Sequence, residues 1–274
     1  GNLIFKNKRI LPVLISENNL LIHKEYQMKI ISNCMYKIST YHFVFSELLK
    51  RDFKKKYKRS VLGVFWSMLA PLLTLLVMNF IFGSFFSRNT HHYMIYLFTG
   101  IIVMTYFTQV TNTGMGALVG NASIFSKVNV PKYLFLFSSV ASSSVNFGLT
   151  LILYFMFVFA DGLSFHFKFL LLIYPILCLI ILSLGVSMIL SALNVFFKDI
   201  VYLYGVFMTA LNYCTPTFYT PDILGDKAYI FNINPLFLVI DYMRRIVIDN
   251  QIPDWKMHFG ILAYALIVLL IGFF

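Results

Sequence analysis

Few residues in this 274-residue chain have the types and spacing that covalent chemistry requires. Cys34, Cys178 and Cys214 lie far apart and follow no metal-binding or redox spacing. His91 and His92 form an adjacent pair, and neighbouring side chains on a helix point in different directions. An exposed loop explains this pair better than a metal site, so the sequence predicts neither a metal centre nor a redox centre.

The motifs of the common enzyme classes are also absent from the sequence. It contains no Gly-Lys pair that could mark a phosphate-binding P-loop, no H-E-x-x-H and no G-x-S-x-G. The five complete apolar runs carry no acidic or basic residue, whereas proton-coupled carriers keep titratable groups inside the membrane. We therefore expect a protein that is not an enzyme, and any uphill transport must draw its energy from another chain.

The composition indicates the class of fold that must position the remaining residues. Hydrophobic residues make up 59% of the chain and charged residues only 12%, about half the charged fraction of an average soluble domain. The mean hydropathy is +0.78. A soluble globule, a disordered chain and a coiled coil do not fit these values. We predict an all-α integral membrane protein.

Crossing about 30 Å of hydrocarbon takes about 20 apolar residues in a helix. We predict six transmembrane helices, at residues 61–86, 94–120, 133–160, 169–197, 200–220 and 257–274. The apolar stretch 228–240 contains Pro235 and is too short to span, so it is predicted to be a re-entrant segment before the last helix. Residues 1–34 form no spanning run and are expected to be an extension or a non-native leader, with 35–274 forming the transmembrane domain.

The formal net charge of +11 is distributed unevenly between the two predicted sides of the membrane. The N-terminal region, the loop at 121–132 and the turn at 198–199 together carry 16 Lys and Arg against five acidic residues. The other loops carry six of each sign. Cytoplasmic loops are the ones enriched in Lys and Arg, so we predict that both termini face the cytoplasm.

The most basic segment lies just before the first predicted span. Phe45, Leu48, Phe53 and Tyr57 recur at helical spacing among basic residues, which is typical of an amphipathic helix in the headgroup layer. We predict this helix at residues 41–59, with membrane lipid as its partner. Its candidate interfacial residues are Lys50, Arg51, Asp52, Phe53, Tyr57 and Arg59. A basic flank that only sets topology is the alternative, and no nucleic-acid partner is expected because no soluble domain accompanies it.

Polar and aromatic residues on the apolar helices are candidates for a substrate path. Sugars stack on aromatic rings and hydrogen-bond to polar groups, so an uncharged aromatic lining suits a glycan. The candidate residues are Trp66, Tyr106, Phe107, Asn112, Tyr213, Phe218, Tyr219, Arg244 and Arg245. Gln109 lies on the same predicted helix as Asn112.

Each of these patterns has a second interpretation. Serines such as Ser183 and Ser187, and the Gly116–Gly120 pair, have the spacing of close helix packing. Tyr213, Phe218 and Tyr219 could anchor the lipid interface instead of lining a path. The pair Arg244-Arg245 could guide a phosphate group or extend toward anionic lipid.

Four stretches, taken in order, resemble the ABC-2 type permease subunits that export O-antigen, capsular and teichoic-acid polysaccharides. They are Arg51-Asp52 with Tyr57-Lys58-Arg59-Ser60-Val61-Leu62-Gly63, Trp66 and Pro71; Ser126-Lys127-Val128-Asn129-Val130-Pro131-Lys132; Leu193-Asn194-Val195-Phe196-Phe197-Lys198-Asp199-Ile200; and Asn234-Pro235-Leu236 with Asp241-Tyr242-Met243-Arg244-Arg245. The family usually has Arg-Asp where this chain has Lys198-Asp199.

The resemblance implies a set of partners. Such a permease pairs with a second copy of itself and with two ATP-binding cassette subunits in the bacterial cytoplasmic (inner) membrane. ATP and Mg would be bound by those subunits, with no cofactor in this chain and a lipid-linked polysaccharide as substrate. The residues expected to couple to the ATPase are Asn121, Ser126, Lys127, Val130, Pro131, Lys132, Lys198 and Asp199.

Other functions stay open from the sequence. Pro131 could simply end a helix, as it would in any loop. An ABC-2 exporter of a drug or lipid is the first alternative. A membrane-embedded glycosyltransferase or acyltransferase would need a cluster of acids or histidines, which the sequence lacks, and a gated channel would not need ATP.

Overall fold

The structure of this protein is a computed structural model that describes residues 41–58, 60–86, 91–125, 127, 130–164 and 166–274. These residues form helices, turns and loops, with no strand among them. The chain divides into two compact units, Gly1–Glu47 and Leu48–Phe274, and the arrangement given below is that of the second. The predicted leader, residues 1–34, lies outside the described residues.

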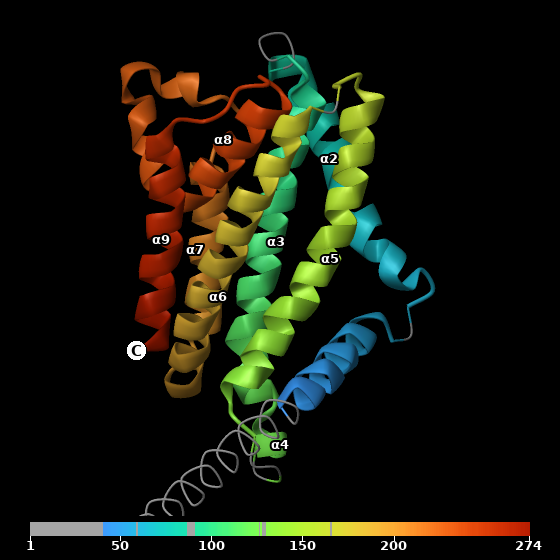
Figure 1. Ribbon diagram of the computed structural model, residues 1–274, viewed down its shortest axis with the longest axis vertical. Helices are drawn as coiled ribbons and strands as arrows, with labels where there is room; N and C mark the ends of the chain where they lie inside the picture. The colour runs from blue at the N-terminus through green and yellow to red at the C-terminus, as the bar shows by residue number, and fades with distance from the viewer. Residues whose placement is uncertain (1–40, 59, 87–90, 126, 128–129, 165) are drawn as a thin grey trace, which may run out of the picture. The chain divides into compact units, whose positions relative to one another are not determined.

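Residues 41–57 are helical, and eleven further helical elements follow them (Figure 1). In order they are η1 (Gly63–Phe65), α2 (Trp66–Phe86), α3 (Tyr93–Gly120), α4 (Ala122–Phe125), α5 (Tyr133–Ala160), η2 (Phe167–Leu172), α6 (Ile173–Phe196), α7 (Ile200–Cys214), η3 (Pro221–Ile233), α8 (Pro235–Val247) and α9 (Trp255–Phe273). The η elements are 3₁₀ helices.

Five of the six predicted spans coincide with helices that are long and apolar enough to cross a membrane. These are Gly63–Phe86, Tyr93–Ile124, Tyr133–Ala160, Phe167–Phe196 and Trp255–Phe273. Charged side chains would oppose burial in hydrocarbon, and these spans carry only two, Lys168 and Lys256, each at the start of its helix. The chain is therefore a multi-pass, all-helical membrane protein, as predicted.

The predicted span at 200–220 is shorter in the structure. Helix α7 ends at Cys214 after 15 residues, which extend about 22 Å and fall short of the hydrocarbon thickness. Thr215 has an extended backbone (φ −94°, ψ 127°), because the ring of the following Pro216 disfavours helical geometry in the residue before it. Residues 215–220 continue without helical structure.

The predicted re-entrant segment, 228–240, also has different bounds. Helices η3 and α8 meet at Asn234 with a bend of 113° between them. Asn234 caps α8 by accepting a hydrogen bond from the amide of Leu236 at 3.0 Å, and Pro235 occupies the first helical position. The bent pair could be one broken span, so the described part of the chain has five or six spans.

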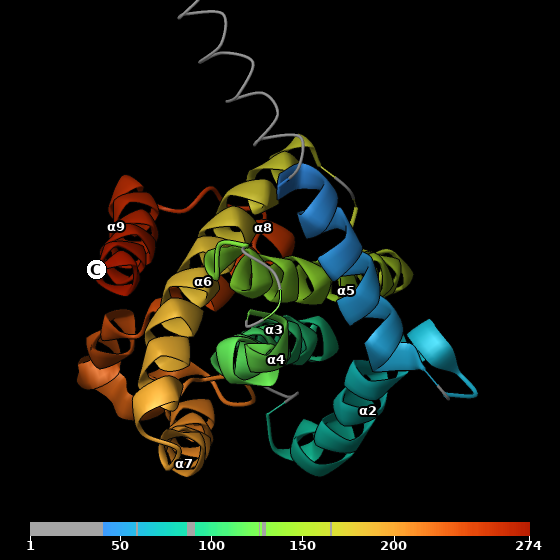
Figure 2. The ribbon, with the colours of Figure 1, turned by 90° about the horizontal axis from the view of Figure 1, so that it is seen from below.

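Helix α3 lies at the centre of the second unit, with α2, α5, α6 and α7 around it (Figure 2). It also contacts α8 and is the most buried of the five spanning helices. Its buried apolar side chains include Ile95, Phe98 and Val110. Because α3 is surrounded by other helices, its polar side chains must either contact those helices or line cavities between them.

Small residues let α3 and α6 come close, as one of the two interpretations of the serines predicts. A Cβ on Gly114 would lie 2.4 Å from Cβ of Ser187, so α3 and α6 touch at this point. Ser183 and Ser187 are fully buried. Gly116 and Gly120 differ, because a Cβ on either would meet nothing within 4 Å. Their close packing against a helix of the same chain is therefore not found.

Candidate functional site

Three cavities lie in a row along α3. The first, of about 600 Å³, lies between α2, α3 and α7. The second, of about 260 Å³, lies between the helical residues 48–57, α2, α3 and α5, and the third, of about 530 Å³, lies between the helical residues 48–57, α3 and α5. The side chain of Gln109 lines all three. Their α3 lining runs from Leu97 to Asn121, which spans about 36 Å of helix and exceeds the hydrocarbon thickness.

The first cavity has no charged residue in its lining. Its polar side chains are hydroxyls and amides, including Thr105, Asn112 and Asn212, and its aromatic side chains are Phe82, Tyr213 and Phe218. Aromatic rings stack on sugars, and uncharged polar groups hydrogen-bond to their hydroxyls. Such a lining neither attracts nor repels a sugar by charge. This lining is of the kind that the sequence pattern predicted.

The third cavity has most of the charged residues of the row, and Lys56 also lines the second. Arg51, Asp52, Lys55 and Lys56 line it from the helical residues 48–57. Arg51 pairs with Asp52, whereas Lys55 and Lys56 form no ion pair with a carboxylate among the described residues. The cavity is therefore cationic. Burial lowers the pKa of Lys56, which lies outside the spanning helices.

Two buried polar atoms in the same cavity lack a hydrogen-bond partner among the described residues. They are Oγ of Ser139 and Nδ2 of Asn146, whose side chains are 5% and 3% exposed. Each of these atoms has less than 1 Å² of exposed surface, so neither is open to the cavity. The cations of Lys55 and Lys56 are the groups that favour an anionic ligand there.

The predicted path residues divide into two groups. Asn112, Tyr213 and Phe218 line the first cavity, and Trp66 and Tyr106 line the second. Phe107 and Tyr219 line none of the three, since Phe107 is buried in the core and Tyr219 borders a separate apolar hollow beside η3.

The two arginines at the end of α8 have different surroundings. Arg244 is 4% exposed and donates hydrogen bonds to carbonyl oxygens on α3 and in residues 215–220. In this structure its guanidinium is presented neither to a phosphate nor to lipid, which corrects both sequence interpretations of this residue. Arg245 is 41% exposed and pairs with Asp241 at 2.9 Å.

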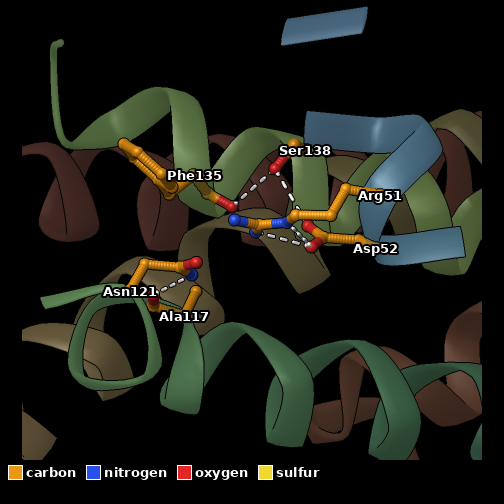
Figure 3. Close-up of polar contacts among 6 residues, drawn as sticks. All are labelled: Arg51, Asp52, Ala117, Asn121, Phe135 and Ser138. Atoms are coloured by element: carbon orange, nitrogen blue, oxygen red, sulfur yellow. Dashed lines mark hydrogen bonds and ion pairs between the residues drawn. The ribbon is translucent and has the colours of Figure 1, made fainter. Parts of the chain in front are cut away.

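The helical residues 48–57 are attached to α5 by a small polar network (Figure 3). Arg51 donates to Oδ1 of Asp52 at 2.7 and 3.0 Å, and Oδ2 of Asp52 accepts from Ser138 on α5 at 3.2 Å. Tyr57 donates to Asn146, and its hydroxyl also lies 2.5 Å from Oγ of Ser67. Part of the predicted interfacial helix thus contacts protein. Arg59 lies outside the described residues.

The predicted ATPase-coupling residues gather at the end of the bundle where α3 and α6 finish. Helix α4 and the turn between α6 and α7 are both at this end (Figure 1). Asn121 ends α3 by donating to the carbonyl of Ala117 at 2.7 Å (Figure 3). The exposed residues there are Lys127, Lys132, Lys198 and Asp199, and the partly buried ones are Val130 and Pro131. Ser126 lies outside the described residues.

Sequence reasoning did not identify the junction of the three cavities. Gln109 was noted only as a polar residue on its helix, and Thr105 and Thr108 were not singled out. Their spacing of three and four residues with Asn112 places all four on one face of a helix, and this periodicity was the available signal.

The fold and the cavities define a multi-pass helical membrane protein with a row of partly polar cavities beside its central helix. The sequence pattern of the ABC-2 type transporter family matches residues 44–248, and the chain belongs to this family.

Curated relatives extend this comparison. An O-antigen export system permease protein RfbA of Klebsiella pneumoniae is 28% identical over 208 residues, which cover 75% of this chain and 80% of the relative. The Myxococcus xanthus protein of that name is 25% identical over 236 residues, or 84% and 89% of the two chains. The polysialic acid transport protein KpsM of Escherichia coli is 22% identical over 229 residues, or 82% and 89%.

Proposed function

We propose that this chain is the membrane-spanning permease subunit of an ATP-driven exporter that moves a lipid-linked polysaccharide out of the cytoplasm. Membership of the ABC-2 family and the names of the relatives support this function. The observation that carries it is the row of three cavities joined at Gln109. A row of this length can accommodate a chain of sugars across the whole hydrocarbon layer.

The chemistry of the row changes along its length in the way that such a substrate requires. The cationic third cavity suits the phosphate groups of a lipid linker. The uncharged first cavity suits a neutral or variable glycan, which must slide without being held by charge. The polymer would therefore enter beside residues 48–57 and leave beside Phe218.

The energy would come from two ATP-binding cassette subunits, which would hold ATP and Mg. Their contact surface would be the loop at 121–132 together with Lys198 and Asp199, which lie at one end of the bundle. The excess of basic residues at this end supports a cytoplasmic position for it and for both termini, in a bacterial inner membrane. The residues near 48–57 would lie at the lipid headgroups.

A second copy of the chain would complete the permease. Helix α7 exposes the side chains of Tyr202, Leu203 and Val206. Exposed apolar residues without a partner in their own chain suit a helix of another copy. Such a dimer would enclose the first cavity between the two chains.

The proposal is tested by filling the path without changing the rest of the fold. Asn112→Phe places a ring at the junction of the first and third cavities and is expected to lower polysaccharide export by about tenfold or more. ATP hydrolysis by the purified complex should persist. The matched control is Val145→Phe on α5, because Val145 is 47% exposed and lines none of the three cavities.

Export is measured as labelled polymer on the cell surface, and the complex is recovered by gentle detergent extraction. Equal export by the two phenylalanine variants would contradict the path. Recovery of the chain alone, with no ATPase able to stimulate it, would contradict the exporter.

A further inference from the structure

The segment at residues 215–220, between α7 and η3, has no helical structure of its own. Thr215 and Thr217 within it are buried. A buried backbone that lacks a helix or sheet needs hydrogen-bond partners from elsewhere for its carbonyl groups. The groups that supply them hold the segment in place.

Arg244 on α8 supplies two of these partners. Its Nη1 donates to the carbonyl oxygen of Pro216 at 2.8 Å, and its Nη2 donates to that of Thr217 at 2.9 Å. The same guanidinium donates to the carbonyl of Tyr96 on α3 at 3.0 and 3.2 Å, and its Cζ lies 3.3 Å from the centre of the Tyr96 ring. One side chain thus joins α8, α3 and the segment.

Two tyrosines near the start of α3 supply the next two partners. The hydroxyl of Tyr93 donates to the carbonyl oxygen of Phe218 at 2.9 Å, and that of Tyr96 donates to the carbonyl oxygen of Tyr219 at 2.9 Å. Four consecutive carbonyls, from Pro216 to Tyr219, are therefore held by side chains. We call the side chains of Tyr93, Tyr96 and Arg244 the carbonyl clamp.

The positive charge of Arg244 is buried without a carboxylate partner among the described residues. The side chain is buried, and it forms no ion pair with a carboxylate among the described residues, because the nearby Asp241 pairs with Arg245. Buried charges are normally compensated by an opposite charge. Here carbonyl dipoles and the face of the Tyr96 ring replace it, so the position of Arg244 depends on the position of the segment.

A glycine on α3, Gly100, leaves room for the segment and for the guanidinium of Arg244. A Cβ on Gly100 would lie 3.1 Å from Cα of Thr217 and 3.2 Å from Nη2 of Arg244. These distances are tighter than ordinary contacts, so a larger residue would push the segment and the guanidinium away from α3. Glycine at this position lets the three groups meet.

The clamped segment positions Phe218 at one end of the row of cavities. Its ring stacks on Phe82 of α2 with centroids 4.7 Å apart and lines the first cavity with that residue. Tyr213 lies edge-on to the same ring at 6.3 Å. The α3 lining of the row ends at Leu97, which directly follows Tyr96 and lies about one turn from Tyr93, so the clamp lies at the end of the proposed path.

We propose that the carbonyl clamp is a positioning device that holds Phe218 across the outer end of the path, so that its contact with Phe82 seals the idle transporter against small solutes. This inference rests on the proposed function, since a seal is needed only where a polymer-sized path crosses the membrane. Arg244 is its central positioning residue. Opening for a polymer would then release the segment from α3.

The test measures leakage in the absence of polymer and of ATP. The intact permease with its ATPase partner is reconstituted into liposomes loaded with glucose, and the efflux of glucose is followed. Tyr93→Phe with Tyr96→Phe removes the two tyrosine hydrogen bonds and keeps the rings. Each lost bond changes the ratio of closed to open states by about fivefold, so efflux is expected to rise by about tenfold or more.

Further variants separate sealing from folding. Phe218→Ala removes the ring itself and is expected to leak at least as fast as the tyrosine double variant. Arg244→Gln is expected to leak when the complex is recovered as a single species in detergent. Tyr229→Phe removes the hydroxyl of an exposed tyrosine on η3 that lies outside the clamp and the three cavities, so it serves as the control and is expected to match the wild type.

Efflux from the Phe218→Ala and tyrosine variants no faster than from the Tyr229→Phe control would overturn the inference. Failure of the proposed function would look different, because it would show as wild-type complex that moves no polysaccharide when ATP is supplied. The leakage comparison needs no polysaccharide, so the two failures are distinguishable.

Discussion

The carboxylate of Asp52 and the hydroxyl of Ser138 lie 3.2 Å apart, although 86 positions separate them in the chain. Their hydrogen bond joins the helical residues 48–57 to the first turns of α5, and Arg51 holds the other carboxylate oxygen. Helix α5 begins directly after the loop at 121–132. A displacement of that loop by a partner subunit would therefore reach the basic helix through this contact.

We predict that Asp52→Asn and Ser138→Ala are coupled. Each change should lower the free energy of unfolding, and a double-mutant cycle should give a coupling of about 0.5–1.5 kcal/mol, the usual size for one hydrogen bond. Export per ATP hydrolysed should fall in both variants, because the ATPase signal would no longer reach residues 48–57. Thermal unfolding in detergent and an export assay measure the two effects.

The control for this pair is Lys54→Ala, which removes an exposed side chain from the same helix. A coupling close to zero, or an equal loss of export in the Lys54 variant, would contradict the role of the Asp52–Ser138 contact.

A second prediction compares two glycines on α3. Gly114→Ala should destabilise the protein by about 1–3 kcal/mol, because the new methyl group would lie 2.4 Å from Cβ of Ser187 and force α3 and α6 apart. Gly116→Ala should be neutral or stabilising by up to about 1 kcal/mol, because it meets open space and alanine favours a helix.

Melting temperatures of the two glycine variants in detergent are sufficient to check this. Loss of stability in the Gly116 variant alone would contradict the packing.

A third prediction concerns the reactivity of Lys56. Burial disfavours the charged form of this side chain and lowers its pKa, so at mildly alkaline pH a larger share of it is the neutral, nucleophilic amine. Limited acylation of the intact complex should therefore modify Lys56 before Lys54, although both side chains are exposed. Peptide mass spectrometry gives the order, and earlier modification of Lys54 would contradict the placement of Lys56 at the cavity.

Much of the fold could be predicted from the sequence, because it depends on local properties. Uncharged runs of spanning length locate five helices, and Pro216 already indicates that α7 ends before 220. The predicted length of that span was wrong because hydropathy does not register where a backbone stops being helical.

The site could be predicted only in part, because it depends on distant contacts. Asn112, Tyr213 and Phe218 were predicted from residue type alone, and they do line one cavity. The environment of Arg244 could not be predicted, because its partner Tyr96 lies 148 positions away and offers a backbone carbonyl, a group that every residue has.

The central claim is that polysaccharide passes along the row of cavities at Gln109, and photo-crosslinking tests it most directly. A benzophenone amino acid is placed at position 109, with position 145 on the outer face of α5 as the control, and the complex is illuminated during export. We predict a glycan adduct at position 109 that requires ATP and disappears when export is blocked, with none at position 145. An adduct at position 145, or none at position 109 while export proceeds, would contradict the path.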